Sequence, residues 1–288
     1  MAAPPDPRLP KELKSAPPPV PNVLVSFPVP HVLIITLNRP RQLNAIPSAQ
    51  HAALAALYAW YDAEPHLRCA VLTGAGRAFC AGADLKEWHV QNSDASSSSA
   101  DRNGFTAAGF GGLSNRAGKK PVVAAVNGLC LGGGFEMVAN CDLVLAASAA
   151  TFGLPEVTRG VVAVAGALPR LARSLGRQRA AELALLGRTG YTAAAMRRWG
   201  LVNFVVPDGE SVVGEALRVA CEVAANSPDA VVVSREGLRL GWEGVGPQMA
   251  TEILANGLYG RIDRGENMWE GVSSFVERRK PVWKDSKL

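Results

Sequence analysis

Two glutamates are the side chains in this sequence that best suit acid–base chemistry. Glu136 follows three consecutive glycines, Gly132, Gly133 and Gly134, and Glu156 comes twenty residues later, after a Phe-Gly-Leu-Pro segment. A pair of carboxyl groups can divide the work of a general acid and a general base. Either glutamate alone would be expected to lie on a solvated surface, so this chemistry requires both to face one site.

The glycines before Glu136 indicate a place for a polarised or negatively charged oxygen. Residues 121–126 are a short apolar run bounded by Lys-Pro and Asn-Gly, which predicts a buried parallel strand, and residues 135–139 have helical apolar spacing. The first amides of a helix have no partner within it, so the Gly133 N–H could form half of an oxyanion hole. Alternatively, the glycines only permit close packing of helix and strand.

A second turn rich in small residues lies earlier in the chain. Residues 69–73 predict another buried strand, and residues 74–86 contain several glycines and alanines before a predicted helix. We expect the second donor for the same carbonyl in this turn. Neither turn has the G-x-G-x-x-G pattern of a dinucleotide site, which disfavours NAD binding.

The other apolar patterns predict an α/β fold. We expect strands at residues 31–37, 142–146 and 201–206 and helices at 48–61, 166–175, 183–187 and 192–199, with a turn at 152–156. After residue 207 the pattern is helical, at 210–225, 229–240 and 248–259. Parallel strands return their carboxyl ends to one edge of a sheet, where Glu136 and Glu156 can meet.

These patterns divide the chain into three parts. Residues 1–21 are a proline-rich tail, expected to be disordered or extended because ten of the twenty prolines fall within residues 1–30. Residues 22–209 form the core, and residues 210–288 form a helical region that packs either within the chain or across a subunit interface. The polar, serine-rich segment 91–103 is expected to be a surface insertion beside the site.

The composition argues against several classes of function. The formal net charge of +5 suits an anionic ligand but is too small to indicate nucleic acid. The five cysteines form no C-x-x-C pair, so we expect them to be reduced structural thiols. The four histidines have no metal-ligand spacing, which argues against a zinc site. No apolar run reaches the roughly 18 residues of a transmembrane helix, so we expect no membrane span.

The last three residues, Ser286-Lys287-Leu288, match the tripeptide that peroxisomal import receptors read. We therefore expect a peroxisomal location, with the import receptor as a partner that binds this tripeptide. Removing the tripeptide should leave the protein in the cytosol.

Several ordered motifs resemble the enoyl-CoA hydratase/isomerase family, also called the crotonase superfamily. They extend from about residue 22 to residue 284 and include LNRP at 37–40, LNA at 43–45, VLTG at 71–74, AGADLK at 81–86, AVNG at 125–128, GGGFE at 132–136, FGLPE at 152–156 and FVERRK at 275–280. The resemblance implies a crotonase-like spiral of repeated ββα units. It also implies a C-terminal helical region that trimerises, often as a dimer of trimers.

The resemblance also implies roles for individual residues. The two oxyanion-hole amides of the family correspond to Ala83 and Gly133, and its two catalytic carboxylates to Glu136 and Glu156. The residues implied to bind coenzyme A are Arg41, Ala45, Asp84, Leu85 and Lys86, and those implied to reach a neighbouring subunit's ligand are Phe275 and Arg278. No metal or separate cofactor is implied, because coenzyme A is part of the substrate.

Two glutamates together favour hydration of an enoyl-CoA over isomerisation of its double bond, for which one carboxylate, at the Glu156 position, suffices. By resemblance, Glu136 is the base that activates water and Glu156 is the proton donor. We therefore expect an enoyl-CoA hydratase in peroxisomal fatty-acid or related acyl-CoA metabolism. The alternatives are a Δ3,Δ2-enoyl-CoA isomerase and an inactive member that binds acyl-CoA or RNA.

One segment departs from the family pattern. Where the family usually has Pro-Gly-Ala-Gly-Gly, this chain has Ala163-Val164-Ala165-Gly166-Ala167. A β-branched side chain at Val164 is expected to narrow or reshape the acyl pocket. Straight-chain crotonyl thioesters are therefore not expected to be the best substrates.

Overall fold

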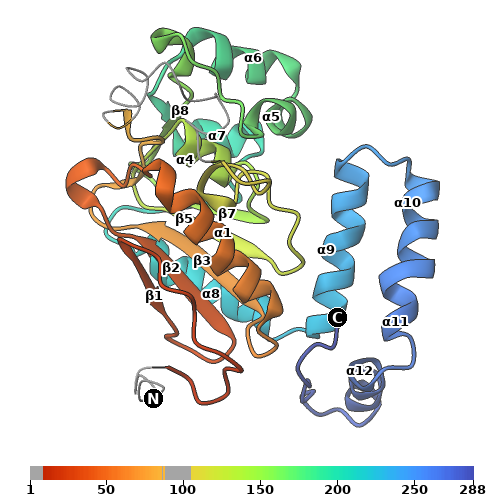
Figure 1. Cartoon of the computed structure of the whole chain (residues 1–288). Coiled ribbons are helices and arrows are strands. Elements are labelled where there is room, and N and C mark those ends of the chain that lie inside the picture. Colours follow the sequence, from red (N-terminus) through yellow and green to blue (C-terminus); the bar gives the residue numbers. More distant parts are fainter. Residues whose placement is uncertain (1–8, 86, 88–104) are drawn as a thin grey trace.

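A six-stranded sheet forms the main layer of the computed structural model, which describes residues 9–85, 87 and 105–288. In sheet order, its strands are β1 (Val23–Ser26), β2 (Val32–Leu37), β3 (Cys69–Gly74), β5 (Val122–Val126), β7 (Leu143–Ala147) and β10 (Phe204–Val206). The β1–β2 pair is antiparallel and the other neighbours are parallel (Figure 1). The carboxyl ends of β3, β5 and β7 therefore share one edge.

A smaller four-stranded sheet lies beyond that edge. Its strands, in order, are β4 (Ala78–Cys80), β6 (Leu129–Leu131), β8 (Thr151–Gly153) and β9 (Tyr191–Thr192). In the consecutive pairs β3/β4, β5/β6 and β7/β8, the first strand joins the large sheet and the second joins the small sheet. This repeat confirms the expected crotonase-like α/β fold.

Helices cover both sheets and form a C-terminal group. They are α1 (Ser48–Ala63), α4 (Gly133–Val138), α5 (Ala167–Leu175), α6 (Arg177–Leu186), α7 (Ala193–Trp199), α8 (Val212–Ala224), α9 (Pro228–Trp242), α10 (Pro247–Leu254), α11 (Gly260–Ile262) and α12 (Glu266–Val276). Side chains that the sequence places just before three of them cap their first amides: Thr192 for α7, Ser211 for α8 and Ser227 for α9. None of the helices among the described residues is long and apolar enough to cross a bilayer.

The large sheet is covered on both faces, which explains the unbroken apolar runs of its central strands. All residues of β3 and β5 are buried. Val71 and Val123 pack with α8, whereas Leu72 and Ala124 belong to a second cluster that includes α1 and the small sheet. Successive residues of a strand point to opposite faces, so a strand between two layers is apolar throughout.

Residues 9–21 contain no helix or strand and follow an extended path against the core. The Glu64 carboxylate accepts hydrogen bonds from the backbone amides of Lys14 (3.0 Å) and Ser15 (3.2 Å). Val20 is buried in the main apolar cluster. The described part of the proline-rich segment is thus anchored, and residues 1–8 lie outside the described residues.

Helices α9 to α12 form a group beside the two sheets (Figure 1). Large apolar side chains on this group are exposed, including Leu238, Trp269, Val272, Phe275 and Val276. Such an exposed apolar surface is typical of an interface with another chain. Assembly into trimers stays a prediction.

The structure differs from the sequence expectations in several short elements and in α6, which spans Arg177–Leu186 where we expected a helix at 183–187. Strand β8 includes Phe152 and Gly153, for which we expected a turn, and β6 lies where we expected only the turn before the glycines. Helix α4 begins at Gly133, two residues earlier than expected. The expected serine-rich insertion at 91–103 lies outside the described residues.

Candidate active site

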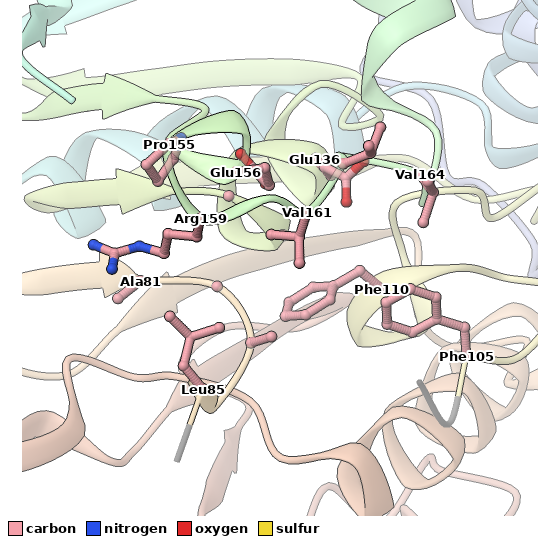
Figure 2. Close-up of a pocket in the computed structure, with 15 residues that line it drawn as sticks. Ala81, Leu85, Phe105, Phe110, Glu136, Pro155, Glu156, Arg159, Val161 and Val164 are labelled. Atoms are coloured by element: carbon pink, nitrogen blue, oxygen red, sulfur yellow. The ribbon is translucent and has the colours of Figure 1, made fainter. Parts of the chain in front are cut away.

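Both predicted catalytic glutamates line one pocket at the edge between the two sheets. Glu136 comes from α4 and Glu156 from the 3-10 turn Glu156–Arg159 that follows β8. Figure 2 shows their carboxyl groups facing the same cavity. With the open space at its mouth, this cavity measures about 580 Å³. Its other lining residues are Ala81, Gly82, Ala83, Leu85, Phe105, Phe110, Gly132, Gly133, Pro155, Arg159, Val161, Val162 and Val164.

The two predicted oxyanion-hole residues lie next to each other in this pocket. A Cβ placed on Gly82 would lie 3.2 Å from the Gly133 nitrogen, so the turn before Ala83 touches the start of α4. Within the described residues, neither the Ala83 N–H nor the Gly133 N–H donates a hydrogen bond. Two unpaired amides side by side can stabilise negative charge on a carbonyl oxygen.

The segment that carries Ala83 is held from the opposite side. Ile46 pairs with this segment: its amide donates to the Gly82 carbonyl (2.9 Å), and its carbonyl accepts from the Asp84 amide (3.3 Å). The Arg39 guanidinium forms an ion pair with the Asp84 carboxylate at 3.0 Å. In a parallel bridge of this kind, the N–H of the middle residue points away from the partner strand, so the Ala83 amide does not bond to the Ile46 segment.

Glu136 is buried in the first turn of α4. Its Oε1 atom accepts hydrogen bonds from the amides of Ala165 (3.0 Å) and Ala167 (3.3 Å). The pKa of Glu136 is raised to about 7. Burial is the main cause and the nearby Glu156 charge adds to it, whereas the two amides and the Arg170 charge partly offset them. Glu136 can therefore gain and lose a proton near neutral pH.

Glu156 lies against the glycines that precede α4. Gly132 has a φ of +54°, and a Cβ at this position would lie 3.0 Å from Glu156 Oε1. Only glycine both adopts this backbone conformation easily and leaves space for the carboxylate. The buried Oε2 atom has no hydrogen-bond partner among the described residues. Burial raises the pKa of Glu156, which makes this side chain a suitable proton donor.

The remaining walls of the pocket are apolar. Val161 lies between the glutamates and the ring of Phe110, and Phe105 packs edge-on against Phe110 with ring centroids 5.9 Å apart (Figure 2). Val164 lines the pocket with 65% of its surface exposed, so its side chain faces open space rather than the core. An apolar wall beside two carboxyls excludes water and strengthens their electrostatic interactions.

Several residues that the family resemblance implied do not line this pocket. Leu85 does, but Arg41 and Ala45 lie outside it, and Asp84 pairs with Arg39 beside it. Phe275 lies in the last turn of α12, a helix of the C-terminal group (Figure 1), and Arg278 follows the end of that helix. Lys86 lies outside the described residues. The roles of these residues in binding coenzyme A stay predictions.

Sequence reasoning missed Phe105, Phe110, Val161 and Arg159. The two phenylalanines follow the serine-rich segment in a stretch with no helical or strand periodicity, where only their size signals burial. Arg159 is the cation among the described residues that line this otherwise acidic and apolar pocket. Phe110 reaches the pocket because the turn Phe110–Gly112 packs against α4, whereas Arg159 and Val161 come from the 3-10 turn after β8 and the loop that follows it.

Two histidines that are far apart in the sequence lie together outside the pocket. The His31 and His66 rings are 4.4 Å apart, and His31 Nδ1 lies 2.7 Å from the His66 carbonyl. With Asp285 they place three potential metal ligands within 4.8 Å of one another. The Arg68 guanidinium lies 3.8 Å from the Asp285 carboxylate, and this positive charge disfavours a cation there.

Comparisons with known proteins match most of this chain. A family model described as enoyl-CoA hydratase/isomerase matches residues 30–286. The mevalonyl-coenzyme A hydratase SIDH of Beauveria bassiana is 62% identical over 275 residues, covering 94% of this chain and 98% of the relative. The mevalonyl-coenzyme A hydratase sidH of Aspergillus fumigatus is 52% identical over 271 residues, with the same shares covered.

Solved structures show the same fold. The crystal structure of an enoyl-CoA hydratase from Mycobacterium tuberculosis matches with a TM-score of 0.80 and 34% sequence identity, covering 92% of this chain and all of that chain. An enoyl-CoA hydratase from Bacillus anthracis matches with a TM-score of 0.81 and 33% identity over a similar share.

Proposed function

The chain belongs to the enoyl-CoA hydratase/isomerase family, and we propose that it is a hydratase that reversibly adds water to the double bond next to a coenzyme A thioester. The observation that supports hydration is that Glu136 and Glu156 line one pocket beside the amides of Ala83 and Gly133, which have no hydrogen-bond acceptor in the described part of the chain. Water addition needs a base at Cβ and a proton donor at Cα, whereas moving a double bond needs only one carboxylate.

The acyl group that we propose is mevalonyl. The Beauveria and Aspergillus relatives are named for mevalonyl-coenzyme A, and each is more than half identical to this chain over 94% of its length. A mevalonyl thioester carries a hydroxyl and a methyl group on Cβ and a second hydroxyl at the end of the chain. This substrate is not an intermediate of the fatty-acid metabolism that we considered from the sequence, and its branched acyl group is consistent with our expectation that straight-chain crotonyl thioesters are not the best substrates.

Two backbone amides stabilise the negative charge that develops on the thioester oxygen. The N–H groups of Ala83 and Gly133 bind this oxygen as the enolate-like state forms, and loss of one such donor typically costs about 2.7–4 kcal/mol. The ion pair between Arg39 and Asp84 holds the Ala83 segment in place, and helix α4 holds Gly133. Because both donors are fixed before substrate binds, little reorganisation is needed during the reaction.

The two glutamates move the protons. In dehydration, Glu156 removes the proton from Cα and Glu136 protonates the departing hydroxyl on Cβ; in hydration, Glu136 activates water and Glu156 protonates Cα. Both directions need one proton on the pair. Their raised pKa values suit this requirement, because a neighbouring charge and burial both disfavour ionising the two carboxyls together. No cofactor is required by these steps.

The apolar wall suits a branched acyl group. Val161 and Phe110 lie opposite the glutamates, where they can contact the methyl group on Cβ (Figure 2). Val164 stands at the open side of the pocket, where the family usually has glycine, and its side chain limits the space for a long straight chain. Burial of one methyl group contributes roughly 0.8 kcal/mol, which is enough to favour a branched substrate several-fold.

Turnover of purified protein with mevalonyl-CoA tests this proposal. Dehydration creates a conjugated thioester, so ultraviolet absorbance follows the reaction directly. We expect turnover with mevalonyl-CoA to exceed that with the straight-chain 3-hydroxybutyryl-CoA, and we expect Glu136→Gln and Glu156→Gln each to abolish it. Turnover of 3-enoyl thioesters alone would indicate an isomerase instead. Binding of both thioesters without turnover would indicate an inactive member of the family.

A further inference from the structure

Arg170 of α5 connects three segments around the pocket. Its Nε atom donates to Asn140 Oδ1 (2.8 Å), its Nη1 atom to the Gly166 carbonyl (3.1 Å) and its Nη2 atom to Asn115 Oδ1 (3.0 Å). Asn140 follows α4, Asn115 follows the Phe110 turn, and Gly166 lies in the loop before α5. A guanidinium is a rigid planar group with several donors, so it can fix the relative positions of all three.

The loop that Arg170 holds is the loop that supplies the amides to Glu136. Gly166 lies between Ala165 and Ala167, whose N–H groups donate to Glu136 Oε1. Gly166 has a φ of +124°, and a Cβ there would lie 2.4 Å from Arg170 Nη1, so the loop and the guanidinium are in close contact. The Arg170 charge also lowers the pKa of Glu136.

Buried hydrogen bonds fix the same loop from the other side. The Ser114 hydroxyl donates to the Ala165 carbonyl and accepts from the Phe110 amide, both at 2.7 Å. The Asn140 side chain donates to the Leu113 carbonyl at 2.7 Å. The Phe110 wall and the Glu136 loop are therefore parts of one network, and Arg170 is the charged group within it.

The C-terminal helices reach this network through Trp242 at the end of α9. The Arg170 guanidinium carbon lies 5.6 Å from the centre of the Trp242 ring, and Arg173, one turn further along α5, donates to the Trp242 carbonyl. An aromatic ring over a guanidinium stabilises its charge and shields it from water. The position of α9 therefore affects Arg170 directly.

We propose that Arg170 is a positioning residue for the Glu136 carboxyl, and that Trp242 links this residue to the C-terminal helices. The catalytic consequence rests on the proposed hydratase function. The structural consequence does not, because the amides of Ala165 and Ala167 hold Glu136 whether or not a substrate binds. Movement of α9, for example on assembly with another chain, would change the proton affinity of the catalytic carboxyl.

Titration of Glu136 in the absence of substrate tests the structural part. The infrared band of the protonated carboxyl, assigned as the band that Glu136→Gln removes, gives its pKa. We expect a midpoint near the value of about 7 in the native protein. We expect a higher midpoint in Arg170→Gln, an intermediate one in Arg170→Lys and a small rise in Trp242→Leu. A lysine keeps the charge but cannot hold three acceptors in one plane.

Arg173→Gln is the matched control, because Arg173 lies on the same helix and contacts Trp242 but bonds none of the segments around Glu136. Because Arg173 also contacts Trp242, we expect at most the small rise of Trp242→Leu in this variant, well below the rise in Arg170→Gln. An unchanged midpoint in both Arg170 variants, or an equal rise in Arg173→Gln, would refute the positioning role. If Arg170→Gln does not fold, Arg170→Lys and Trp242→Leu still decide the question.

Kinetics test the catalytic part. We expect kcat/KM for mevalonyl-CoA to fall by about tenfold or more in Arg170→Gln, since small misplacements of a catalytic group are costly. In dehydration Glu136 must be protonated, so its pKa sets the alkaline limb of the pH profile, and this limb should move to higher pH in parallel with the infrared midpoint. A fall in kcat/KM without movement of the limb would indicate a merely structural effect. Absence of turnover in the native protein would refute the hydratase function but leave the infrared result intact.

Discussion

Replacing Glu136 with glutamine should stabilise the protein at high pH. The pKa of Glu136 rises from 4.5 to about 7 in the folded chain because the carboxyl is buried. At a pH below 4.5 the group is protonated in both states and has no effect. As pH rises above 4.5 the unfolded chain loses this proton first, so stability falls, and the full loss is reached above pH 7. The side chain is only 3% exposed, so solvent screens little of this effect.

The magnitude follows from the two pKa values. The difference between 4.5 and about 7 corresponds to roughly 3 kcal/mol of unfolding free energy when the carboxyl is fully ionised. The variant is already slightly more stable than the native protein at pH 5, because some ionisation occurs in the unfolded chain at that pH. From pH 5 to pH 8 we expect the difference in unfolding free energy between Glu136→Gln and the native protein to grow by roughly 2–3 kcal/mol. The glutamine Oε1 atom can still accept the amides of Ala165 and Ala167, so those hydrogen bonds persist.

Urea unfolding of both proteins at pH 5, 6, 7 and 8, at one protomer concentration, measures this difference. Glu210→Gln is the matched control, because that glutamate is exposed to solvent and its replacement should give no such trend. A stability difference between Glu136→Gln and the native protein that stays constant across the series would refute the reasoning. It would mean that the Glu136 carboxyl is as well solvated in the folded chain as in the unfolded chain.

Three further predictions follow from the pocket and the chain end. Gly82→Ala places a Cβ 3.2 Å from the Gly133 nitrogen at a φ of +94°, which should displace one donor of the oxyanion hole and lower kcat about 100-fold. Gly190→Ala is the control: its Cβ would have no atom within 4 Å, so native kcat should be retained. Val164→Gly should raise kcat/KM for straight-chain 3-hydroxyacyl thioesters relative to mevalonyl-CoA, and an unchanged ratio would show that Val164 does not limit the acyl chain. We propose that the protein is peroxisomal, so a fluorescent fusion without residues 286–288 should remain in the cytosol, and continued import would refute this.

Long apolar segments were the most predictable parts of the fold. Strand β5 and helix α1 lie within two residues of the ranges expected from their patterns. Both have many buried neighbours, and their patterns reflect this packing. The three-residue strands β6 and β8 were not predicted, because so few residues show no period and their pairing depends on strands far away in sequence.

The candidate site was predictable only where a motif supplied it. The glycines beside Glu136 and the small residues around Ala83 indicated an oxyanion hole, and the structure brings both into one pocket. Arg170 carries no such signal, since its importance depends on three acceptors from separate loops. The proximity of His31 and His66 was likewise invisible, because each lies in a different turn.

The shared pocket of the two glutamates has a consequence for successive catalytic cycles. A molecule hydrated by the proposed route leaves its proton on Glu136 and takes one from Glu156, so the protein is left in the state that dehydration requires. A second hydration must wait for a proton to pass from Glu136 to Glu156, either directly or through solvent. Glu156 Oε2, which has no partner among the described residues, can receive that proton. Relative thioester concentrations then decide the net direction of flux.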